Sequence, residues 1–221
     1  MKIKIFCILI VSFISTITLT VSAEDSSKTY FSAGMMSITD KGLDELKGTG
    51  VTIDDNDTIA NFSLGYKVSP SLSFEGGILS SGEVTASLPT GNKSGTFQGK
   101  TYSASGTATV KAKTDTSYLF GLKYSGKIGS YPLSLNMKAG QLFWDVDYIA
   151  SASGTITYGG TTYSGSITEE TLLAVDGSDL YFGIGMSYEL SNNSSIDLDY
   201  ISTEINGSDI NGYSLSWVGN F

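Results

Sequence analysis

Alternation of apolar and polar residues with a period of two constrains this chain more than any other feature. Successive side chains of a β-strand point to opposite faces, so this pattern predicts strands with one apolar face. In residues 180–190 the apolar phase is Phe182, Ile184, Met186, Tyr188 and Leu190. Residues 60–68 and 213–221 alternate in the same way. No stretch after residue 23 holds eighteen consecutive apolar residues, which excludes membrane-spanning helices there.

Eight segments with this alternation are expected to be strands. They cover residues 28–38, 58–68, 71–80, 115–127, 133–149, 180–190, 195–205 and 211–221. The connections alternate between short turns rich in proline, asparagine and serine and the long segments 39–57, 81–114 and 150–179, with a brief Asn/Gly-rich connection at 206–210 before the last strand. Long loops on one rim and short turns on the other are typical of outer-membrane barrels.

The first 23 residues are expected to be a signal peptide. Lys2 and Lys4 precede an apolar run, and Val21-Ser22-Ala23 provides the small residues of a cleavage site. The barrel domain then covers residues 24–221. Removing the two lysines leaves 11 lysines against 22 acidic residues, a net charge of −11. The only cysteine, Cys7, leaves with the leader, so the mature chain has no disulfides or thiolate metal sites.

Alternation alone does not say which face meets water, because a soluble sandwich or lipocalin-like barrel alternates too. The polar phase combines glycine and serine with single charges, which suits a narrow barrel interior. The apolar phase is rich in aromatic residues near segment ends, which suits membrane interfaces. A sheet in lipid must also close, since an open edge leaves backbone groups unpaired. We therefore expect an all-β fold, a transmembrane antiparallel up-and-down β-barrel of eight strands.

Two motifs carry a resemblance to a known family. The chain ends in Tyr213, Leu215, Trp217 and Phe221 at alternating or near-alternating positions, which resembles the C-terminal assembly signal of bacterial outer-membrane barrels. Gly219 departs from the bulkier residue usual there. The run 64–77, LGYKVSPSLSFEGG, resembles the second hairpin of the small OmpA-like/OmpX-like eight-stranded barrels of Gram-negative bacteria. The resemblance covers essentially the whole mature chain, and no peptidoglycan-binding domain is expected after the barrel.

This resemblance implies a location in the bacterial outer membrane. It implies contact with outer-membrane lipid and lipopolysaccharide, recognition of the C-terminal strand by the barrel assembly machinery, and a monomer. Small barrels that deacylate or acylate lipid A depend on a histidine. The chain contains no histidine, so neither activity is carried over, and no cofactor or enzymatic role is expected. The acidic balance and the absence of arginine argue against nucleic acid as a partner.

Assigning the polar phase to the interior places seven charges in the lumen. They are Lys67, Glu75, Lys123, Lys138, Glu189, Asp197 and Asp199. Isolated buried charges are costly unless paired, so one interpretation is a mutually satisfied network that plugs the barrel. The alternative is a narrow cation-selective pore lined by the acids. Asp197 and Asp199 share a face, but that spacing alone gives little support to a catalytic pair.

Two long loops contain a weak internal repeat. Residues 99–105 (GKTYSAS) match residues 160–166 (GTTYSGS), and each unit reads as a hairpin that turns at glycine. We expect strands that run on past the membrane as β-ribbons. One interpretation is convergence of Ser/Thr/Gly-rich surface hairpins; the other is a paired surface for adhesion or ligand binding, with Tyr102 and Tyr163 as contacts.

The first loop contains the acidic run Asp54-Asp55-Asn56-Asp57. It suggests a calcium site but lacks the glycine and distal glutamate of an EF-hand, which favours a solvated acidic loop. Residues 40–47 are expected to form one or two helical turns, with Asp40 as N-cap.

Two strand assignments stay open. The lipid face of the first strand is either Phe31, Ala33 and Met35 or the phase of Tyr30. In 133–149 the apolar residues change phase near Gly140, which indicates either a bulge or passage out of the membrane.

Overall fold

The computed structural model describes residues 28–89 and 91–221. The expected leader, residues 1–23, lies outside the described residues. Eight strands form the barrel. They are β1 (Thr29–Asp40), β3 (Asn56–Lys67), β4 (Leu72–Leu79), β8 (Ser117–Lys127), β9 (Leu133–Tyr158), β10 (Thr161–Ser191), β11 (Ser194–Ile205) and β12 (Ser208–Asn220).

The barrel closes without an open edge. Each strand pairs antiparallel with its neighbours in the order β1, β3, β4, β8, β9, β10, β11 and β12. Strand β12 then pairs with β1, from Tyr30 opposite Asn220 to Asp40 opposite Ile210. All eight expected strands are present, so the prediction of an eight-stranded antiparallel barrel is confirmed.

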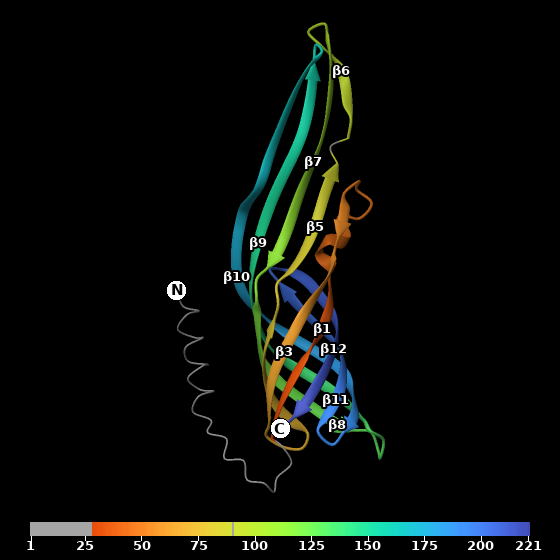
Figure 1. The fold of residues 1–221 in the computed structure, drawn as a ribbon, viewed down its shortest axis with the longest axis vertical. Helices are drawn as coiled ribbons and strands as arrows, with labels where there is room; N and C mark the ends of the chain where they lie inside the picture. Colours follow the sequence, from red (N-terminus) through yellow and green to blue (C-terminus); the bar gives the residue numbers. More distant parts are fainter. Residues whose placement is uncertain (1–27, 90) are drawn as a thin grey trace.

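Four further strands belong to the long-loop side of the molecule. They are β2 (Thr52–Asp54), β5 (Gly82–Pro89), β6 (Lys93–Phe97) and β7 (Lys100–Thr114). Strand β7 pairs with β5, β6 and β9, and the upper part of β9 pairs with β10. Together these segments form a sheet that projects far beyond the barrel, which we call the blade (Figure 1). The C-terminus lies at the opposite end of the barrel.

The expected β-ribbons are therefore present, but they pair with each other and form a single sheet. The two repeat units turn where predicted, with positive φ at Gly99 (74°) and at Gly159 and Gly160 (56° and 85°). The register between β7 and β9, with Tyr102 opposite Tyr158, then joins both hairpins into one sheet. Pairing between distant loops leaves no local signal in the sequence, which is why alternation alone did not indicate it.

The single helix among the described residues is short. The 3₁₀ helix η1 (Lys41–Leu46) follows Asp40, whose side chain accepts a hydrogen bond from the backbone N–H of Gly42 at 2.8 Å. This agrees with the expected helical turn and N-cap. Within the described part of the chain, no helix has the length and apolar character needed to cross a membrane.

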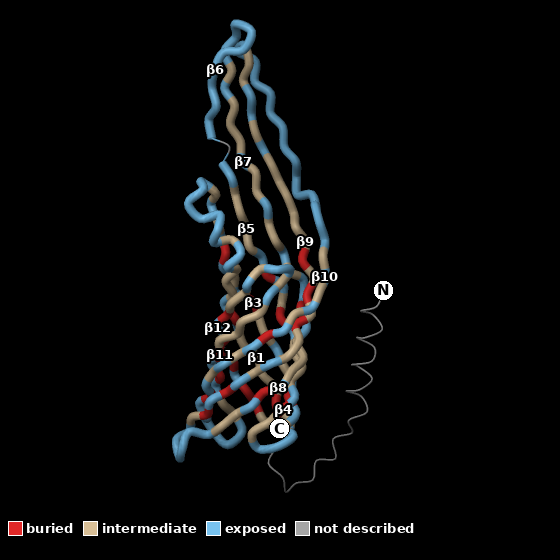
Figure 2. The backbone as a smooth tube through the Cα atoms, turned by 180° about the vertical axis from the view of Figure 1, so that it is seen from behind, coloured by how far each residue is buried: buried red, intermediate tan, exposed pale blue. Residues whose placement is uncertain are grey.

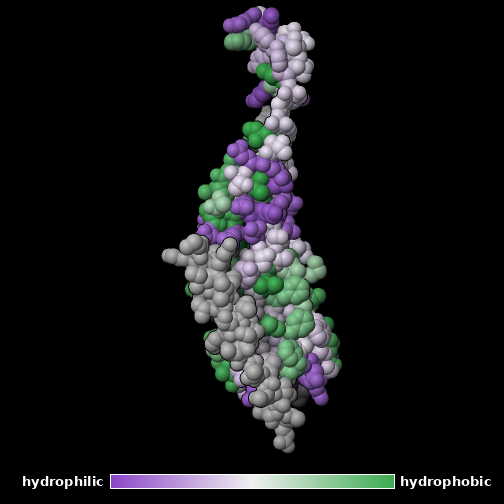
Figure 3. All heavy atoms as spheres, turned by 60° about the vertical axis from the view of Figure 1, so that its left-hand side comes forward, coloured by the Kyte–Doolittle hydropathy of each residue, from purple (hydrophilic) through white to green (hydrophobic). Residues whose placement is uncertain are grey.

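The outward face of the barrel is a belt of exposed apolar side chains. It includes Phe62, Leu64, Phe74, Leu122, Met137, Phe182, Ile184, Met186, Leu198, Leu215 and Trp217. Figure 3 shows apolar side chains over the visible part of the barrel, below a band of hydrophilic residues. A closed sheet that satisfies its backbone internally and exposes an apolar belt is the architecture of an outer-membrane barrel.

The first strand is now assigned. Tyr30 and Met36 are buried inside the barrel, at 3% and 4% exposure, whereas Met35 is 60% exposed on the outside. Phe31 lies beside the outward-facing Trp217, with ring centroids 5.8 Å apart. The lipid face of β1 is therefore the phase of Phe31, Ala33 and Met35.

Strand β9 explains the change of phase near Gly140. Its register with β8 runs without a shift through Gly121 opposite Gly140, so no bulge is present there. Below Gly140 the apolar residues Leu135 and Met137 face outward, and above it Leu142 and Val146 face inward and are buried. The strand leaves the apolar belt at this level, so its outer face meets water and its apolar residues turn to the interior.

The interior of the barrel accordingly has two parts. We call the part toward the short turns, which is polar and charged, the lower lumen, and the part toward the blade the upper lumen. The upper lumen contains a cluster of buried side chains: Met36, Ile59, Leu79, Leu142, Trp144, Val146 and Tyr181. In Figure 2 the buried residues lie in the barrel and at the base of the blade.

Candidate functional site

The lower lumen contains two buried ion pairs. The Nζ atom of Lys123 lies 2.6 Å from Asp197 Oδ2, and that of Lys138 lies 2.8 Å from Asp199 Oδ2. Glu75 lies between the two lysines, at 4.0 Å from Lys123 and 3.7 Å from Lys138. These five groups come from β4, β8, β9 and β11, so the network crosses the lumen from wall to wall.

An aromatic residue of β1 holds Glu75 in place. The hydroxyl group of Tyr30 donates to Glu75 Oε1 at 2.7 Å, and the ammonium of Lys123 lies 5.4 Å from the centre of the Tyr30 ring. The ring lies flat against Gly65, where a Cβ atom would come within 2.0 Å of it. Gly65 is therefore required for the close approach that positions Tyr30.

Uncharged groups fill the rest of this layer. The Asn136 side chain is fully buried; it accepts from Ser125 Oγ and donates to Ser187 Oγ, both at 2.7 Å. Asn61 donates to Ser214 Oγ at 2.5 Å on the other side of the barrel. Asp199 Oδ1 is the one buried side-chain oxygen or nitrogen with no hydrogen-bond partner among the described residues. The layer is therefore densely paired.

Two of the seven charges assigned to the lumen lie apart from this network. Lys67 is half-buried near the lower rim and donates to Asn220 Oδ1 at 2.6 Å. Glu189 is paired at 2.9 Å with Lys127, and both side chains are exposed. Strand β10 reaches the lower rim at this level, so Glu189 faces water rather than the interior. The five remaining predicted residues are brought together.

The blade has two chemically different faces. Directly opposed residues of neighbouring strands share a face, so the register defines each row. One row crosses four strands as Leu88, Ala108, Ala152 and Ile167. The parallel rows of the same face, which we call the apolar face, carry Val110, Phe97, Tyr102, Ile156, Tyr158 and Tyr163. The alternate residues are almost entirely serine and threonine, with hydroxyl pairs such as Ser105–Thr155 at 3.0 Å; we call this the hydroxyl face.

Both loop residues singled out from the sequence lie on the apolar face. Tyr102 and Tyr163 flank β9, and Tyr163 is 59% exposed. Sequence reasoning missed Phe97, Ile156 and Ile167, which lie on the same face and are more than 40% exposed. The signal was present, since each residue continues the period-two pattern of its segment, but it could be recognised only once the β7–β9 pairing was known.

The acidic run of the first loop does not form an open carboxylate cluster. Asp55 is buried and pairs with Lys47 at 2.7 Å, while Asp57 accepts the backbone N–H of Glu83 at 2.7 Å. Lys47 also binds Asp44 at 2.6 Å, and this hydrogen bond lowers the pKa of that carboxyl group. Among the described residues no group of acids is arranged to hold a metal ion. The interpretation as a solvated loop misses the structural role of Asp55 and Asp57.

The C-terminal strand presents Tyr213, Leu215 and Trp217 on the lipid face, and Phe221 is exposed directly after it. The indole ring of Trp217 folds over Gly219, where a Cβ atom would lie 2.5 Å from the ring. A larger residue at 219 would displace Trp217, which accounts for the departure from the usual motif at this position.

No protein-family model and no curated protein sequence matches this chain. Solved structures with a similar fold include Ail, the attachment invasion locus protein of Yersinia pestis, in complex with the heparin analogue sucrose octasulfate; the identity is 13%, the TM-score 0.48, and the match covers 89% of this chain and all of Ail. OprG from Pseudomonas aeruginosa shares 12% identity with a TM-score of 0.47, covering 89% and 96% of the two chains. Neisserial surface protein A shares 12% identity with a TM-score of 0.41, covering 90% and 100%. At these identities the likeness is one of fold alone.

Proposed function

We propose that this protein is a non-enzymatic outer-membrane barrel that supports the envelope and presents the apolar face of its blade to an extracellular partner. The observation that carries the proposal is the pair of unlike faces on one projecting sheet. Soluble surfaces rarely expose a contiguous apolar patch unless it binds something. Here Leu88, Phe97, Val110, Ile156, Tyr163 and Ile167 are all exposed on one side.

The composition of this face favours a protein partner. Tyrosine and phenylalanine supply large contact areas and are enriched at interfaces, whereas lysine and glutamate are depleted at interface centres. Along its centre the apolar face carries alanine, valine and glycine between the aromatic side chains. Lys100, whose ammonium lies 5.6 Å from the centre of the Tyr158 ring, marks its tip. We therefore expect a partner surface with its own apolar patch.

Matched substitutions on the two faces test adhesion. Phe97→Ser with Tyr163→Ser removes two exposed rings from the apolar face. Thr157→Ala with Thr162→Ala removes a hydroxyl pair, 2.9 Å apart, from the hydroxyl face. We expect attachment of cells displaying the protein to octyl-coated beads, and aggregation of those cells, to fall about ten-fold for the first variant only.

Deletion of residues 94–109 together with 153–168 should reduce attachment at least as far while the barrel remains folded, as checked by heat-shifted gel mobility. Unchanged attachment after this deletion would rule out the adhesive function. The envelope function is tested separately: the deleted form should restore detergent resistance to cells that lack the protein, because it keeps the whole barrel.

A small ion pore is the alternative function. The paired charges of the lower lumen and the apolar upper lumen both favour a plugged barrel, since a conducting path needs a continuous polar lining. Conductance of the refolded mature protein in planar bilayers distinguishes the plugged barrel from the ion pore. We expect silent bilayers at high protein load; a cation-selective current abolished by Asp197→Asn would instead support the pore.

We further propose that the protein is a monomer in contact with lipopolysaccharide, and that its C-terminal strand is read by the barrel assembly machinery. The outward placement of Leu215 and Trp217 supports this, since both face the surroundings of the barrel. Phe221→Ala is expected to lower the amount of assembled protein without changing the stability of the fraction that folds.

A further inference from the structure

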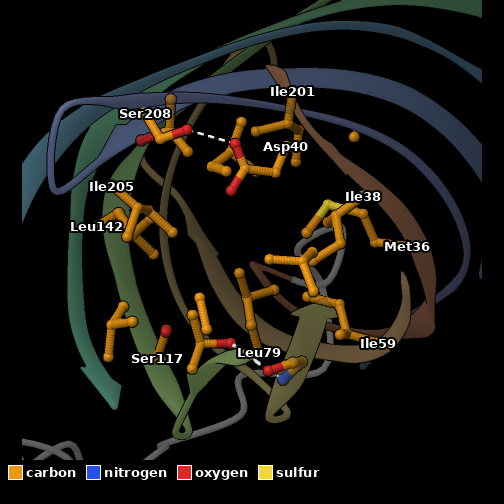
Figure 4. A pocket seen from close by; sticks show the side chains of 18 of the residues that line it. Met36, Ile38, Asp40, Ile59, Leu79, Ser117, Leu142, Ile201, Ile205 and Ser208 are labelled. Carbon is orange, nitrogen blue, oxygen red and sulfur yellow. Dashed lines mark hydrogen bonds between the residues drawn. The ribbon is translucent and has the colours of Figure 1, made fainter. Parts of the chain in front are cut away.

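The upper lumen contains a cavity that the proposed adhesion does not use. Its volume is about 80 Å³, and side chains from nearly all strands of the barrel surround it (Figure 4). Most of its lining is apolar, including Met36, Ile59, Leu79, Leu142, Ile201 and Ile205. A water molecule needs about 10–15 Å³ and two to four polar partners, so the space is large enough for water but poor in partners for it.

The floor of the cavity is closed. Tyr181 lines the cavity and is 3% exposed, and its ring lies against Gly121 and Gly140 in the barrel wall. Lys138 and Asp199, on the strands that flank Tyr181 in the barrel, form one of the buried ion pairs. A molecule in the cavity therefore has no route from the short-turn side that avoids the ion-pair network.

The opening toward the blade is polar. Asp40 and Ser208 line the cavity on this side, and Ser208 Oγ donates to the Asp40 carboxylate, as seen in Figure 4. Glu83 lies opposite Lys113 on the other face of the sheet, 3.3 Å from Lys111, so its carboxylate faces away from the cavity. No lysine is among the described residues that line the cavity. The site is thus apolar in its depth and carries a carboxylate and a hydroxyl at its mouth.

The apolar face of the blade leads into this site. Val84, Ala112 and Tyr148 form one cross-strand row and all three line the cavity. The next row outward carries Ala86 and Val110. An apolar molecule therefore meets a continuous apolar surface from the blade down to the cavity.

We propose that the upper lumen binds the hydrocarbon end of a small single-chain amphiphile whose head group is an amine or an alcohol. An engineered apolar cavity of about 150 Å³ holds one benzene, so a space of about 80 Å³ suits an unbranched alkyl chain of about three or four carbons rather than a ring. The head group lies beside the Asp40–Ser208 pair, where an ammonium or hydroxyl group can donate to the Asp40 carboxylate. That carboxylate at the mouth disfavours an anionic head group.

Methyl NMR of methionine tests this binding with an internal control. Residues 24–221 contain four methionines, of which Met36 lines the cavity, while Met35, Met137 and Met186 are exposed on the lipid face. The protein is placed in lipid nanodiscs free of detergent and titrated with butylamine, butanol or butyrate. We expect the Met36 signal to shift saturably with butylamine and butanol, and about ten-fold more weakly with butyrate.

A matched pair of variants locates the site. Ala112→Leu fills the cavity, and Ala139→Leu makes the same change on the lipid face of β9. The Met36 response should vanish in the first variant and persist in the second. Leu79→Ala enlarges the cavity and should shift the preference from butylamine to hexylamine, which keeps the test valid if Ala112→Leu does not fold.

Several results would overturn the proposal. These are equal, unsaturable shifts of all four methionines, a Met36 response that survives in Ala112→Leu, or no change of chain-length preference in Leu79→Ala. Butyrate binding as tightly as butylamine would overturn the assignment of the head group. None of these residues is in the segments deleted to test adhesion, so failure of the cavity proposal can be distinguished from failure of the adhesion proposal.

Discussion

The lower and upper lumen are lined by the same strands, yet the lower lumen is charged and the upper lumen is apolar. Around the lower lumen the barrel is surrounded by its apolar belt, so apolar side chains face outward and the interior holds Lys123, Lys138 and their carboxylates. Around the upper lumen the wall leaves that belt, and apolar side chains such as Leu142 and Val146 turn inward. The medium outside a strand therefore decides what its inner face contains. Strand β9 shows both solutions on either side of Gly140.

Breaking an ion pair of the lower lumen should have the largest effect. Lys123→Ala leaves Asp197 buried at 2% exposure without its cation, which is expected to lower the free energy of unfolding by about 3–5 kcal/mol. Equilibrium urea unfolding of the protein in lipid vesicles measures this. The double variant Lys123→Met with Asp197→Leu should recover most of the loss. Equal stability of single and double variants would contradict the paired network.

Charges placed on the outer face of β9 test the boundary directly. Met137→Lys puts a charge in the apolar belt and should cost about 2–4 kcal/mol, as for lysine on the lipid face of other barrels. Ile149→Lys is on the same face of the same strand above the belt, and there the cost should be below about 0.5 kcal/mol. Comparable losses from both variants would show that the belt extends further up the strand than Gly140 indicates.

Sequence alone indicated the barrel well, because period two survives wherever one face is buried or in lipid. The blade-side ends of β9 and β10 were harder to predict from the sequence, since both strands continue into the blade with serine and threonine in one phase. The inward phase of Tyr30 and Met36 was undecided because β1 carries large apolar or aromatic side chains in both phases, with Phe31 and Met35 in the other. The apolar face of the blade depends on pairing between loops some fifty residues apart, which no local pattern reports.

Removing a hydrogen bond of the upper lumen should have an intermediate effect. Trp144 Nε1 donates to Asp179 Oδ2 at 2.8 Å, so Trp144→Phe leaves that carboxylate without this donor and should cost about 1–3 kcal/mol. Trp217→Phe on the lipid face is the control and should cost less. The comparison uses the same vesicles and urea series. A larger loss from Trp217→Phe would argue that the upper lumen is not a packed interior.

The smallest expected effect concerns the acids above the belt. Partial burial, followed by repulsion from Asp176, Asp115 and Asp147, raises the pKa of Asp145. A raised pKa means that the folded state binds the proton more tightly, so stability falls as pH rises through that pKa. Asp145→Asn should therefore stabilise the base of the blade by about 0.5 kcal/mol at neutral pH. The gain should shrink as the pH is lowered, as followed by protease resistance of the blade.

The central claim is that the interior changes from charged to apolar where the wall leaves the apolar belt. Its most direct test is a nitroxide scan along the outer face of β9. Residues 24–221 contain no cysteine, so single cysteines at Leu135, Met137, Ile149 and Thr155 can each be labelled in a chain without its leader and without a background signal. The labels at 135 and 137 should collide preferentially with oxygen, which concentrates in lipid. The labels at 149 and 155 should collide preferentially with a water-soluble nickel chelate. An oxygen preference that continues through 149 and 155 would contradict the account.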